Sequence, residues 1–407
     1  MEPKIRLKGY SGEWVEKTLG EISTSFSGGT PSAGVAQYYG GNIPFIRSGE
    51  INDDHTQLFI TEEGLNSSSA RMVDKGTLLY ALYGATSGEV GISKIHGAIN
   101  QAILAIYPSK EICTKYLAHY LRAKKEQIIG NLLQGGQGNL SGALVKGVKI
   151  HYPSAVEDQE AIGNYLDKID TLIQSTSKKI EALKRVKSAS MQSMFPQESE
   201  TAPRIRFKGF EGEWIKSVVG DLGTTYSGLS GKTKEDFGKG DAKYITFLNV
   251  LTNAKIDTSI LEAVKVCEGE RQNKVQQGDL LFNTSSETPE EVGMCAVMEK
   301  NIDNVYLNSF CFGFRLTDTN TSPLFISYIL RSHIGRRLMS LLAQGATRYN
   351  LSKTSFCKAT ILLPSTKEEQ QLIADYFANL DYQINLQSQR LEKLKQIKAA
   401  CLDNMFV

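Results

Sequence analysis

Two long stretches of the chain carry apolar residues at alternating steps of four and three. The first runs from Ile162 to Met194 and the second from Ile373 to Met405. A 3.5-residue repeat sustained over this length predicts a helix that packs its apolar stripe against a partner helix. The stripe positions assigned to this coiled coil are Ile162, Leu166, Ile169, Ile173, Ile180, Leu183, Ile373, Phe377, Leu380, Ile384, Leu391 and Leu394.

The start of each helix carries a capping signal. Ser154 with Glu157, and Ser365 with Glu368, have the spacing of a capping box and directly follow a proline. At the other end, Pro196 is predicted to stop the first helix.

Polar residues interrupt the two stripes at matching places. Thr176 corresponds to Gln387, and Lys187 corresponds to Lys398. Polar residues in a seam often fix its register. We expect the helices to pair antiparallel about an axis near Thr176 and Gln387, which would place Lys187 opposite Tyr376. The alternative is that each helix packs only on its own globular part.

The chain contains an internal repeat that includes both the globular parts and the long helices. Residues 4–30 align with 204–230 with 11 identities in 27, and residues 153–195 align with 364–406 with 16 identities in 43. Short β-like runs at 76–84 and 278–286 also correspond, whereas 30–75 and 230–277 are hard to align. The alignable segments surround a part that has diverged between the copies. This pattern favours two modules of one fold with different specificities, although neutral drift would look similar.

These patterns predict an α+β protein with two globular, α/β-mixed domains in a pseudo-two-fold arrangement. Two long helices forming an antiparallel coiled coil would separate the domains. The predicted segments are 1–152 for the first domain, 153–200 for the first helix, 201–363 for the second domain and 364–407 for the second helix. A duplicated binder often meets a target that itself has two parts.

The composition is that of a soluble globular protein and does not indicate a binding partner. The chain has 407 residues, a net charge of +2 and 41% hydrophobic residues, as in ordinary soluble proteins. It has no apolar run long enough for a membrane span or a signal peptide, and its six cysteines are scattered. We therefore expect a cytoplasmic protein with reduced thiols. A nearly neutral charge neither requires nor excludes nucleic acid.

Signatures of catalysis are missing from the sequence. The run Gly228–Thr233 resembles a phosphate loop but has Tyr226 where the first glycine belongs, and the glycine-rich run 135–142 lacks the third glycine of a dinucleotide site. No Asn-Pro-Pro-aromatic or Asp-Pro-Pro-aromatic tetrad occurs, and the five histidines lack metal-ligand spacing. We expect no catalytic residues, no metal and no cofactor on this chain.

Two basic segments suit contacts with DNA. Residues 323–352 contain four arginines and no acid, and their counterpart, 115–141, is also mainly basic. Both end in a Gln-Gly loop followed by Asn-Leu-Ser, which offers the amide and guanidinium groups that read bases. The alternative is a solvated surface with ordinary turn residues. The candidate DNA-binding residues are Ser27, Thr30, Tyr83, Thr86, Lys124, Lys125, Gln134, Gln137, Asn139, Tyr226, Lys232, Asn283, Arg336, Arg337, Gln344, Arg348, Tyr349 and Asn350.

The same motifs occur in the same order in both copies, and in this the chain resembles the specificity subunit of type I restriction-modification systems. Each copy has Lys-Gly-aromatic-x-Gly-Glu-Trp, then Gly-Asp/Thr-Leu-Leu, then Gln-Gly before Asn-Leu-Ser, and then Pro-Ser-x-x-Glu-x-Gln opening a helix that ends in Met-Phe. The first copy also has Ser-Gly-Gly-Thr-Pro-Ser at 27–32, whereas the second reads Ser-Gly-Leu-Ser-Gly at 227–231. The resemblance covers essentially the whole chain.

The resemblance implies that this chain recognises DNA and that its partner subunits carry out catalysis. Each globular domain would be a target-recognition domain that reads one half of a split DNA sequence. The coiled coil would be a spacer and a platform for two methyltransferase subunits, which restriction subunits join. S-adenosylmethionine, ATP and magnesium would then belong to those partners. Two other classes stay open: a coiled-coil protein-interaction scaffold without a role on DNA, and a stand-alone DNA-modifying enzyme.

Overall fold

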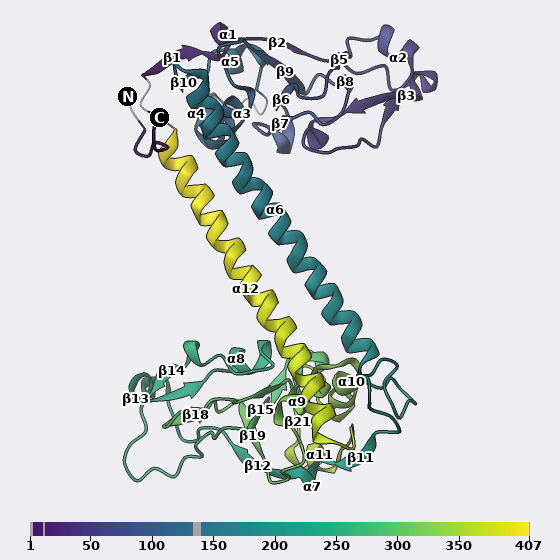
Figure 1. Cartoon of the computed structure of the whole chain (residues 1–407), viewed down its shortest axis with the longest axis vertical. Coiled ribbons are helices and arrows are strands. Elements are labelled where there is room, and N and C mark those ends of the chain that lie inside the picture. Colours follow the sequence, from purple (N-terminus) through teal and green to yellow (C-terminus); the bar gives the residue numbers. More distant parts are fainter. Residues whose placement is uncertain (1–2, 11–12, 133–139, 407) are drawn as a thin grey trace. The chain divides into compact units, whose positions relative to one another are not determined.

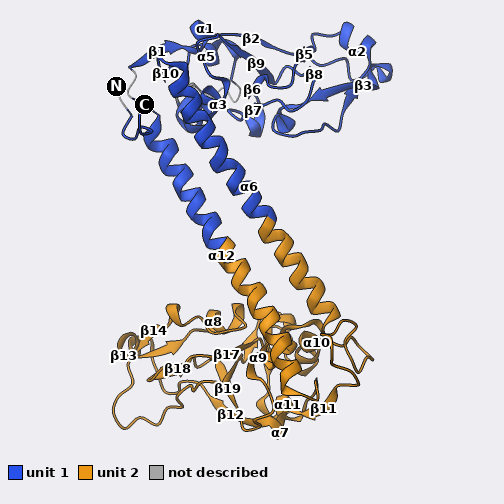
Figure 2. Cartoon of the chain, viewed as in Figure 1, with its two compact units in different colours: residues 1–178, 388–407 blue, residues 179–387 orange. Residues whose placement is uncertain are grey.

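The computed structural model describes residues 3–10, 13–132 and 140–406 (Figure 1). The chain forms two compact units, which are described separately (Figure 2). Unit 1 comprises residues 1–178 and 388–407, and unit 2 comprises residues 179–387. Each unit holds one globular part and one half of each long helix, α6 (Val156–Ser193) and α12 (Lys367–Met405).

Unit 1 has one four-stranded sheet against which helices pack, a second four-stranded sheet and a two-stranded ladder. In hydrogen-bonding order these are β2-β9-β6-β7, β4-β3-β8-β5 and β1-β10. The strands are β1 (Trp14–Thr18), β2 (Ser23–Ser27), β3 (Tyr39–Ile46), β4 (Phe59–Ile60), β5 (Arg71–Val73), β6 (Leu78–Ala81), β7 (Val90–Ile92), β8 (Gly97–Ile99), β9 (Ile103–Pro108) and β10 (Lys149–Pro153). The short helices are α1 (Leu19–Ile22), α2 (Glu62–Asn66), α3 (Thr114–Ala123), α4 (Lys125–Leu132) and α5 (Gly142–Lys146).

Unit 2 repeats this plan. Its sheets are β12-β19-β15-β17, β14-β13-β18 and β11-β22, with a further small sheet, β16-β21-β20. The strands are β11 (Ile215–Val218), β12 (Gly223–Ser227), β13 (Phe237–Ile245), β14 (Glu262–Val264), β15 (Leu280–Asn283), β16 (Ser285–Ser286), β17 (Cys295–Val297), β18 (Val305–Leu307), β19 (Cys311–Leu316), β20 (Ala343–Gln344), β21 (Tyr349–Leu351) and β22 (Thr360–Leu363). The short helices are α7 (Val219–Leu222), α8 (Phe247–Thr252), α9 (Pro323–Arg331), α10 (His333–Leu342) and α11 (Lys353–Lys358).

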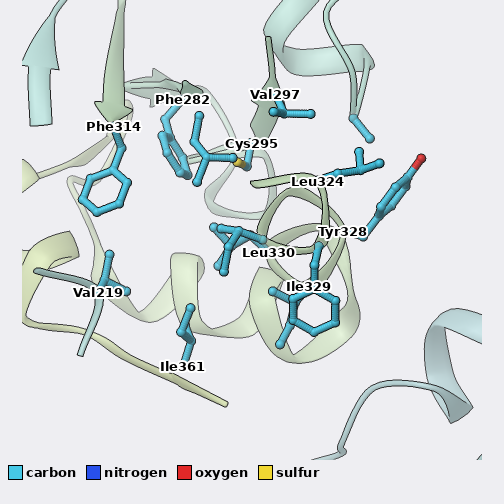
Figure 3. Close-up of a cluster of buried hydrophobic side chains, with 14 of the residues drawn as sticks. Val219, Phe282, Cys295, Val297, Phe314, Leu324, Tyr328, Ile329, Leu330 and Ile361 are labelled. Atoms are coloured by element: carbon cyan, nitrogen blue, oxygen red, sulfur yellow. The ribbon is translucent and has the colours of Figure 1, made fainter. Parts of the chain in front are cut away.

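The core of unit 2 lies between its main sheet and α9. Figure 3 shows Leu324, Ile329 and Leu330 of α9 gathered with Phe282 and Phe314 of the sheet, and all five are buried. Burying aromatic and branched side chains on this scale stabilises a unit by about 1.5–3 kcal/mol per side chain. The sheet and helices therefore form a rigid support for the loops at the sheet edge.

The halves of the long helices that lie within each unit run antiparallel. In unit 1, Lys398 Nζ lies 2.5 Å from Asp170 Oδ1, and Tyr165 lies beside Cys401. From Lys398 to Cys401 the residue numbers rise along α12, while those of their partners on α6 fall from Asp170 to Tyr165. The two helices therefore run in opposite directions. The predicted α+β class, the repeated globular part and the antiparallel pairing of the long helices are confirmed.

The same seam contacts recur in unit 2. Lys187 Nζ pairs with Asp381 Oδ1, and Ser190 Oγ lies 2.9 Å from Tyr376 Oη. Adding 211 to Asp170 gives Asp381, so the two Asp–Lys pairs are the same contact made by the two copies of the repeat. The expected register, with Lys187 opposite Tyr376, is wrong by about one helical turn because each lysine instead reaches the aspartate.

The predicted seam residues face inward. None of them is exposed: Ile162, Leu166, Ile169, Ile180, Ile373, Phe377 and Leu380 are buried, and Ile173, Leu183, Ile384, Leu391 and Leu394 are half-buried. The lysines of the stripe are also half-buried, so each Asp–Lys pair is only partly screened by water.

The predicted capping boxes are wrong by one residue. Helix α6 begins at Val156 and α12 at Lys367, so the caps fall on Ala155 and Thr366. Thr366 Oγ1 accepts from the amide of Glu369 at 3.4 Å. The amide of Ser154 donates to the carbonyl of Glu13 at 2.8 Å, which continues the pairing of β1 with β10 by one residue and keeps Ser154 outside the helix.

A buried glutamine joins the first turn of each long helix to its own globular part. Gln159, 0% exposed, accepts from the amide of Cys113 at 2.9 Å and donates to the carbonyls of Glu111 and Pro153. Gln370, 3% exposed, makes the equivalent bonds to Ser322, Asn320 and Pro364. The last residue of Pro-Ser-x-x-Glu-x-Gln is therefore structural.

Each long helix ends in the core of the unit in which it did not begin. Phe406, at the end of α12, lies 5.4 Å from Tyr116 and 5.6 Å from Tyr120 between ring centroids in unit 1. Phe195, after the end of α6, lies 5.5 Å from Phe377 in unit 2. The Met-Phe ends therefore anchor the helices by aromatic packing.

We predict that Gln159→Ala destabilises unit 1 by about 2–3 kcal/mol, because the amide of Cys113 and two carbonyls lose a buried partner. Urea-induced unfolding of the full chain would measure the loss. The matched control is Gln174→Ala, an exposed position on the same helix, where we expect a change within about 0.5 kcal/mol. Equal stability of the two variants would contradict the structural role of Gln159.

Candidate nucleic-acid interface

One edge of the main sheet gathers several loops in unit 1. The last residue of β2, Ser27, is paired with Leu104, and the last residue of β6, Ala81, is paired with Ile103. Because β9 begins between these two strand ends, the loops after β2 and β6 and the loop before β9 meet there. We call this edge of the main sheet loop edge 1.

Unit 2 has the equivalent edge. Ser227 ends β12 opposite Phe312, and Asn283 ends β15 opposite Cys311. The loops after β12 and β15 and the loop before β19 therefore meet at what we call loop edge 2.

The same backbone hydrogen bonds hold both edges. In unit 1, the amide of Leu82 donates to Ala102 O at 2.8 Å, and the amide of Leu140 donates to Leu82 O at 3.0 Å. In unit 2, the amide of Thr284 donates to Phe310 O at 2.9 Å, and the amide of Leu351 donates to Thr284 O at 2.8 Å. One scaffold thus presents two different sets of loop side chains.

The Ser-Gly step that opens each edge is required by close packing. A Cβ on Gly28 would lie 1.9 Å from Ile99 O, and a Cβ on Gly228 would lie 2.1 Å from Asn308 O. The second copy then departs from the first. Leu229, 3% exposed, packs in a small apolar cluster where the first copy has Gly29. The changed residue therefore fills a core in unit 2.

Four predicted residues lie in the loops of loop edge 1 or at their start. Ser27, Tyr83 and Thr86 are half-buried, and Thr30 is exposed and hydrogen-bonded to Gln101. Thr86 Oγ1 donates to Tyr83 O at 3.2 Å within a 3₁₀ turn. These side chains line the edge together.

Two of the predicted residues of the first basic segment belong to the described part of the chain. Lys124 and Lys125 lie where α3 meets α4, and Lys125 Nζ lies 2.6 Å from Glu89 Oε1. Gln134, Gln137 and Asn139 lie outside the described residues.

An exposed hairpin carries four predicted residues of unit 2. Strands β20 and β21 pair Gln344 with Asn350, and β16 pairs Ser285 with Asn350. This pairing anchors the hairpin on loop edge 2. Gln344, Arg348 and Asn350 are exposed and Tyr349 is half-buried. Gly345 turns the hairpin with φ 138°, where a Cβ would lie 2.1 Å from Arg348 O.

Asn283 is a correction to the predicted set. It is 0% exposed, its amide donates to the carbonyls of Ser285 and Glu291, and its Oδ1 accepts from the amide of Met294 at 2.6 Å. Its side chain shapes the loop after β15 and has no surface with which to touch a base.

Arg336 is a second correction. Its guanidinium donates to the carbonyls of Glu290, Val292, Gly293 and Leu330, which leaves its donors engaged within the protein. Burial, with Arg331 nearby, lowers the pKa of Arg336 to about 10. It ties α10 to the turn after β16 and is excluded from the interface proposed below.

Tyr226 and Lys232 are also engaged within unit 2. Tyr226 Oη donates to Asp279 Oδ2 at 2.6 Å, and burial together with that carboxylate raises the pKa of Tyr226. Lys232 Nζ lies 2.5 Å from Glu270 Oε2 with a side chain only 5% exposed, and it lowers the pKa of Glu270 to about 2. Both support the loop after β12.

Arg337 lies on α10 away from the hairpin. It pairs with Glu198 beside a cavity of about 430 Å³ that is also lined by Ile334, Leu338 and Leu341. Nothing in its contacts connects it with loop edge 2.

Four contacts at the loop edges were not predicted from the sequence. Lys353 Nζ donates to Ser227 Oγ at 2.6 Å, and Gln272 donates to Ser230 O at 2.8 Å. Asn308 Oδ1 accepts from the amide of Phe310 at 2.8 Å, and Asn100 does the same for Ala102 at 3.1 Å. The asparagine shared by Ile99-Asn100 and Leu307-Asn308 was the available signal.

Within residues 3–10, 13–132 and 140–406, no group of three or more His, Cys, Asp or Glu side chains is placed to hold a metal ion. Among the same residues, no helix combines the length and apolar character needed to cross a bilayer.

A family model described as the type I restriction modification DNA specificity domain matches residues 11–185 and again 211–396. The chain is 30% identical to the type I restriction enzyme MjaIX specificity subunit of Methanocaldococcus jannaschii over 182 residues, which are 43% of this chain and 42% of that subunit. That alignment therefore spans less than half of the MjaIX subunit.

Two other similarities extend over nearly the whole chain. The type I restriction enzyme EcoKI specificity subunit of Escherichia coli K12 is 21% identical over 411 residues, covering 94% of this chain and 87% of that subunit. The crystal structure of the type I restriction-modification S subunit from M. genitalium matches 100% of this chain and 99% of its own, with a TM-score of 0.64 and 15% identity. The fold is therefore shared across both copies of the repeat.

Proposed function

The chain belongs to the family of type I restriction-modification DNA specificity proteins, and we propose that it selects the DNA sequence on which its partner subunits act. Residues 1–152 and 201–363 are the two recognition domains, and residues 153–200 and 364–407 are the helices between them. Each recognition domain reads one half of a bipartite double-stranded target.

The observation that carries this proposal is the pair of loop edges. Both are held by the same backbone hydrogen bonds, yet their side chains differ: Ala102 in one corresponds to Phe310 in the other, and Gly29 corresponds to Leu229. A common scaffold with different side chains is suited to reading two different short sequences.

The exposed hairpin of unit 2 supplies groups of the right chemistry. Arg348 can bind guanine in the major groove with two hydrogen bonds, and Gln344 or Asn350 can bind adenine in the same way. The basic segment 323–352 has no acidic residue to repel phosphates. In unit 1 the corresponding contacts are assigned to Ser27, Thr30, Tyr83, Thr86 and Lys124.

The long helices are proposed to bind the partner subunits. They form the platform for two methyltransferase subunits, and restriction subunits then join the complex. S-adenosylmethionine, ATP and magnesium bind those partners, and this chain supplies recognition without catalysis. The exposed faces of α6 and α12 outside the buried stripe are the available surface.

Binding to DNA by the chain assembled with its methyltransferase partner tests the proposal. We expect the affinity for duplex DNA to fall steeply as salt rises, because phosphate contacts release counterions. Arg348→Ala is expected to weaken binding about five- to a hundredfold if the side chain reads a base. Fluorescence anisotropy over a salt series would measure both effects.

Arg204→Ala is the control for that variant. Arg204 is also an exposed arginine of unit 2, but it is paired with Glu200 away from the hairpin, and we expect its replacement to leave affinity unchanged. An assembled complex that binds no duplex at any salt would contradict the proposal and favour a protein-interaction scaffold. Methyl transfer by the isolated chain would instead favour a stand-alone enzyme.

The helices are also proposed to set the spacing between the two half-sites. Helix α6 has 38 residues and α12 has 39, and at about 1.5 Å per residue they are about 57 and 59 Å long. Successive major grooves on one face of DNA are about 34 Å apart. A helical spacer of this length is sufficient to span one turn of DNA.

Deleting one heptad from each helix is expected to change the number of unspecified bases in the recognised sequence. The deletion shortens each helix by about 10 Å while keeping the phase of the apolar stripe. Sequencing the methylated sites in cells that express the variant with its partners would measure the spacer. The same spacer in wild type and variant would contradict a ruler role for the helices.

A further inference from the structure

Phe310 is an apolar side chain left in solvent. Among the chain's phenylalanines it is the most exposed, at 59%, whereas its neighbour Phe312 is 0% exposed. A single exposed apolar residue is common on protein surfaces and carries no meaning by itself. The place of Phe310 in the fold is what distinguishes it.

The backbone of Phe310 is held at both ends. Its amide donates to Asn308 Oδ1 at 2.8 Å, and its carbonyl accepts from the amide of Thr284 at 2.9 Å. The loop therefore presents the ring from a fixed backbone, and little conformational entropy is lost when a ligand contacts it.

The neighbours of Phe310 belong to loop edge 2. Thr284, which bonds Phe310, also accepts from the amide of Leu351, and the adjacent Asn350 pairs with Ser285. The hairpin that carries Arg348 and Asn350 is thus two backbone hydrogen bonds away from Phe310. An exposed aromatic ring beside amide and guanidinium groups matches the composition of a surface that contacts bases.

The equivalent position of unit 1 is different. Ala102 occupies the same place in the backbone pattern, bonded to Asn100 and Leu82, but it is only 8% exposed. The scaffold therefore tolerates a small side chain here, so the fold does not require an aromatic residue.

We propose that Phe310 is a base-contacting, specificity-determining residue of the half-site read by unit 2. This inference rests on the proposed function and extends it. The ring makes apolar contact with the bases, as phenylalanine does with the methyl group of thymine, and unit 1 reads its half-site without such a contact.

The test uses the full chain with its methyltransferase partner in cells whose DNA is otherwise unmethylated. Sequencing the methylated sites gives the motif, and a 40-base-pair duplex carrying that motif is the binding probe. We expect Phe310→Ala to weaken binding to this duplex about tenfold and to relax the motif at one or two positions of one half-site only. Binding to a duplex without the motif should stay unchanged, and Phe310→Leu should restore part of the affinity.

Leu248→Ala, at an apolar position of unit 2 that is 65% exposed, is the matched control and should leave motif and affinity unchanged. A wild-type motif and affinity in Phe310→Ala would overturn the inference. So would weaker assembly with the methyltransferase subunit while the remaining methylation keeps the wild-type motif, which would mark Phe310 as a protein contact. If the wild-type complex shows no motif at all, the proposed function fails, and this inference fails with it.

Discussion

Neither globular part completes its core with its own copy of the repeat. The ring of Phe406, directly after α12, packs against Tyr116 and Tyr120 in unit 1, and Phe195 packs against Phe377 in unit 2. Each ring is nearly or wholly buried, and removing such a side chain from a core costs about 3–5 kcal/mol. The two copies must therefore exchange helix ends, and this constraint requires both long helices.

Exchange of helix ends also explains why the seam is antiparallel and why its polar residues repeat. Asp170 with Lys398 and Asp381 with Lys187 are one contact made twice. A partly buried ion pair adds little net stability, because desolvation offsets most of its attraction. Its effect is on register, since a shift by one turn would separate each half-buried lysine from the aspartate that neutralises it. The buried glutamines Gln159 and Gln370 then fix the start of each helix on its own globular part.

Periodicity predicted most of this fold. The paired helices followed from spacing alone, because burial imposes the 3.5-residue repeat directly. The duplication followed from identities between the two copies, and the α+β class from short β-like runs beside the helices. The register did not follow, since nothing local to Lys187 indicates that Asp381 and not Tyr376 is its partner. The helix start was misplaced for a similar reason: the ladder bond from Ser154 to Glu13 is set by a residue far away in the sequence.

The candidate interface was less predictable. Residue type selected Arg348 and Asn350, which are exposed on the hairpin, and it selected Asn283 and Arg336 equally, although both donate to backbone carbonyls. A polar side chain that binds its own protein and one that faces solvent look alike in a sequence. The exposure of Phe310 could not be predicted, because an apolar residue in the sequence beside buried neighbours gives no sign that it faces solvent.

The central claim is that one chain reads two different half-sites through two copies of one scaffold. Sequencing the methylated sites in the source genome tests it most directly. The account predicts a motif of two short specified parts that differ from each other and are separated by a fixed number of unspecified bases. A continuous motif, or two identical half-sites, would contradict it.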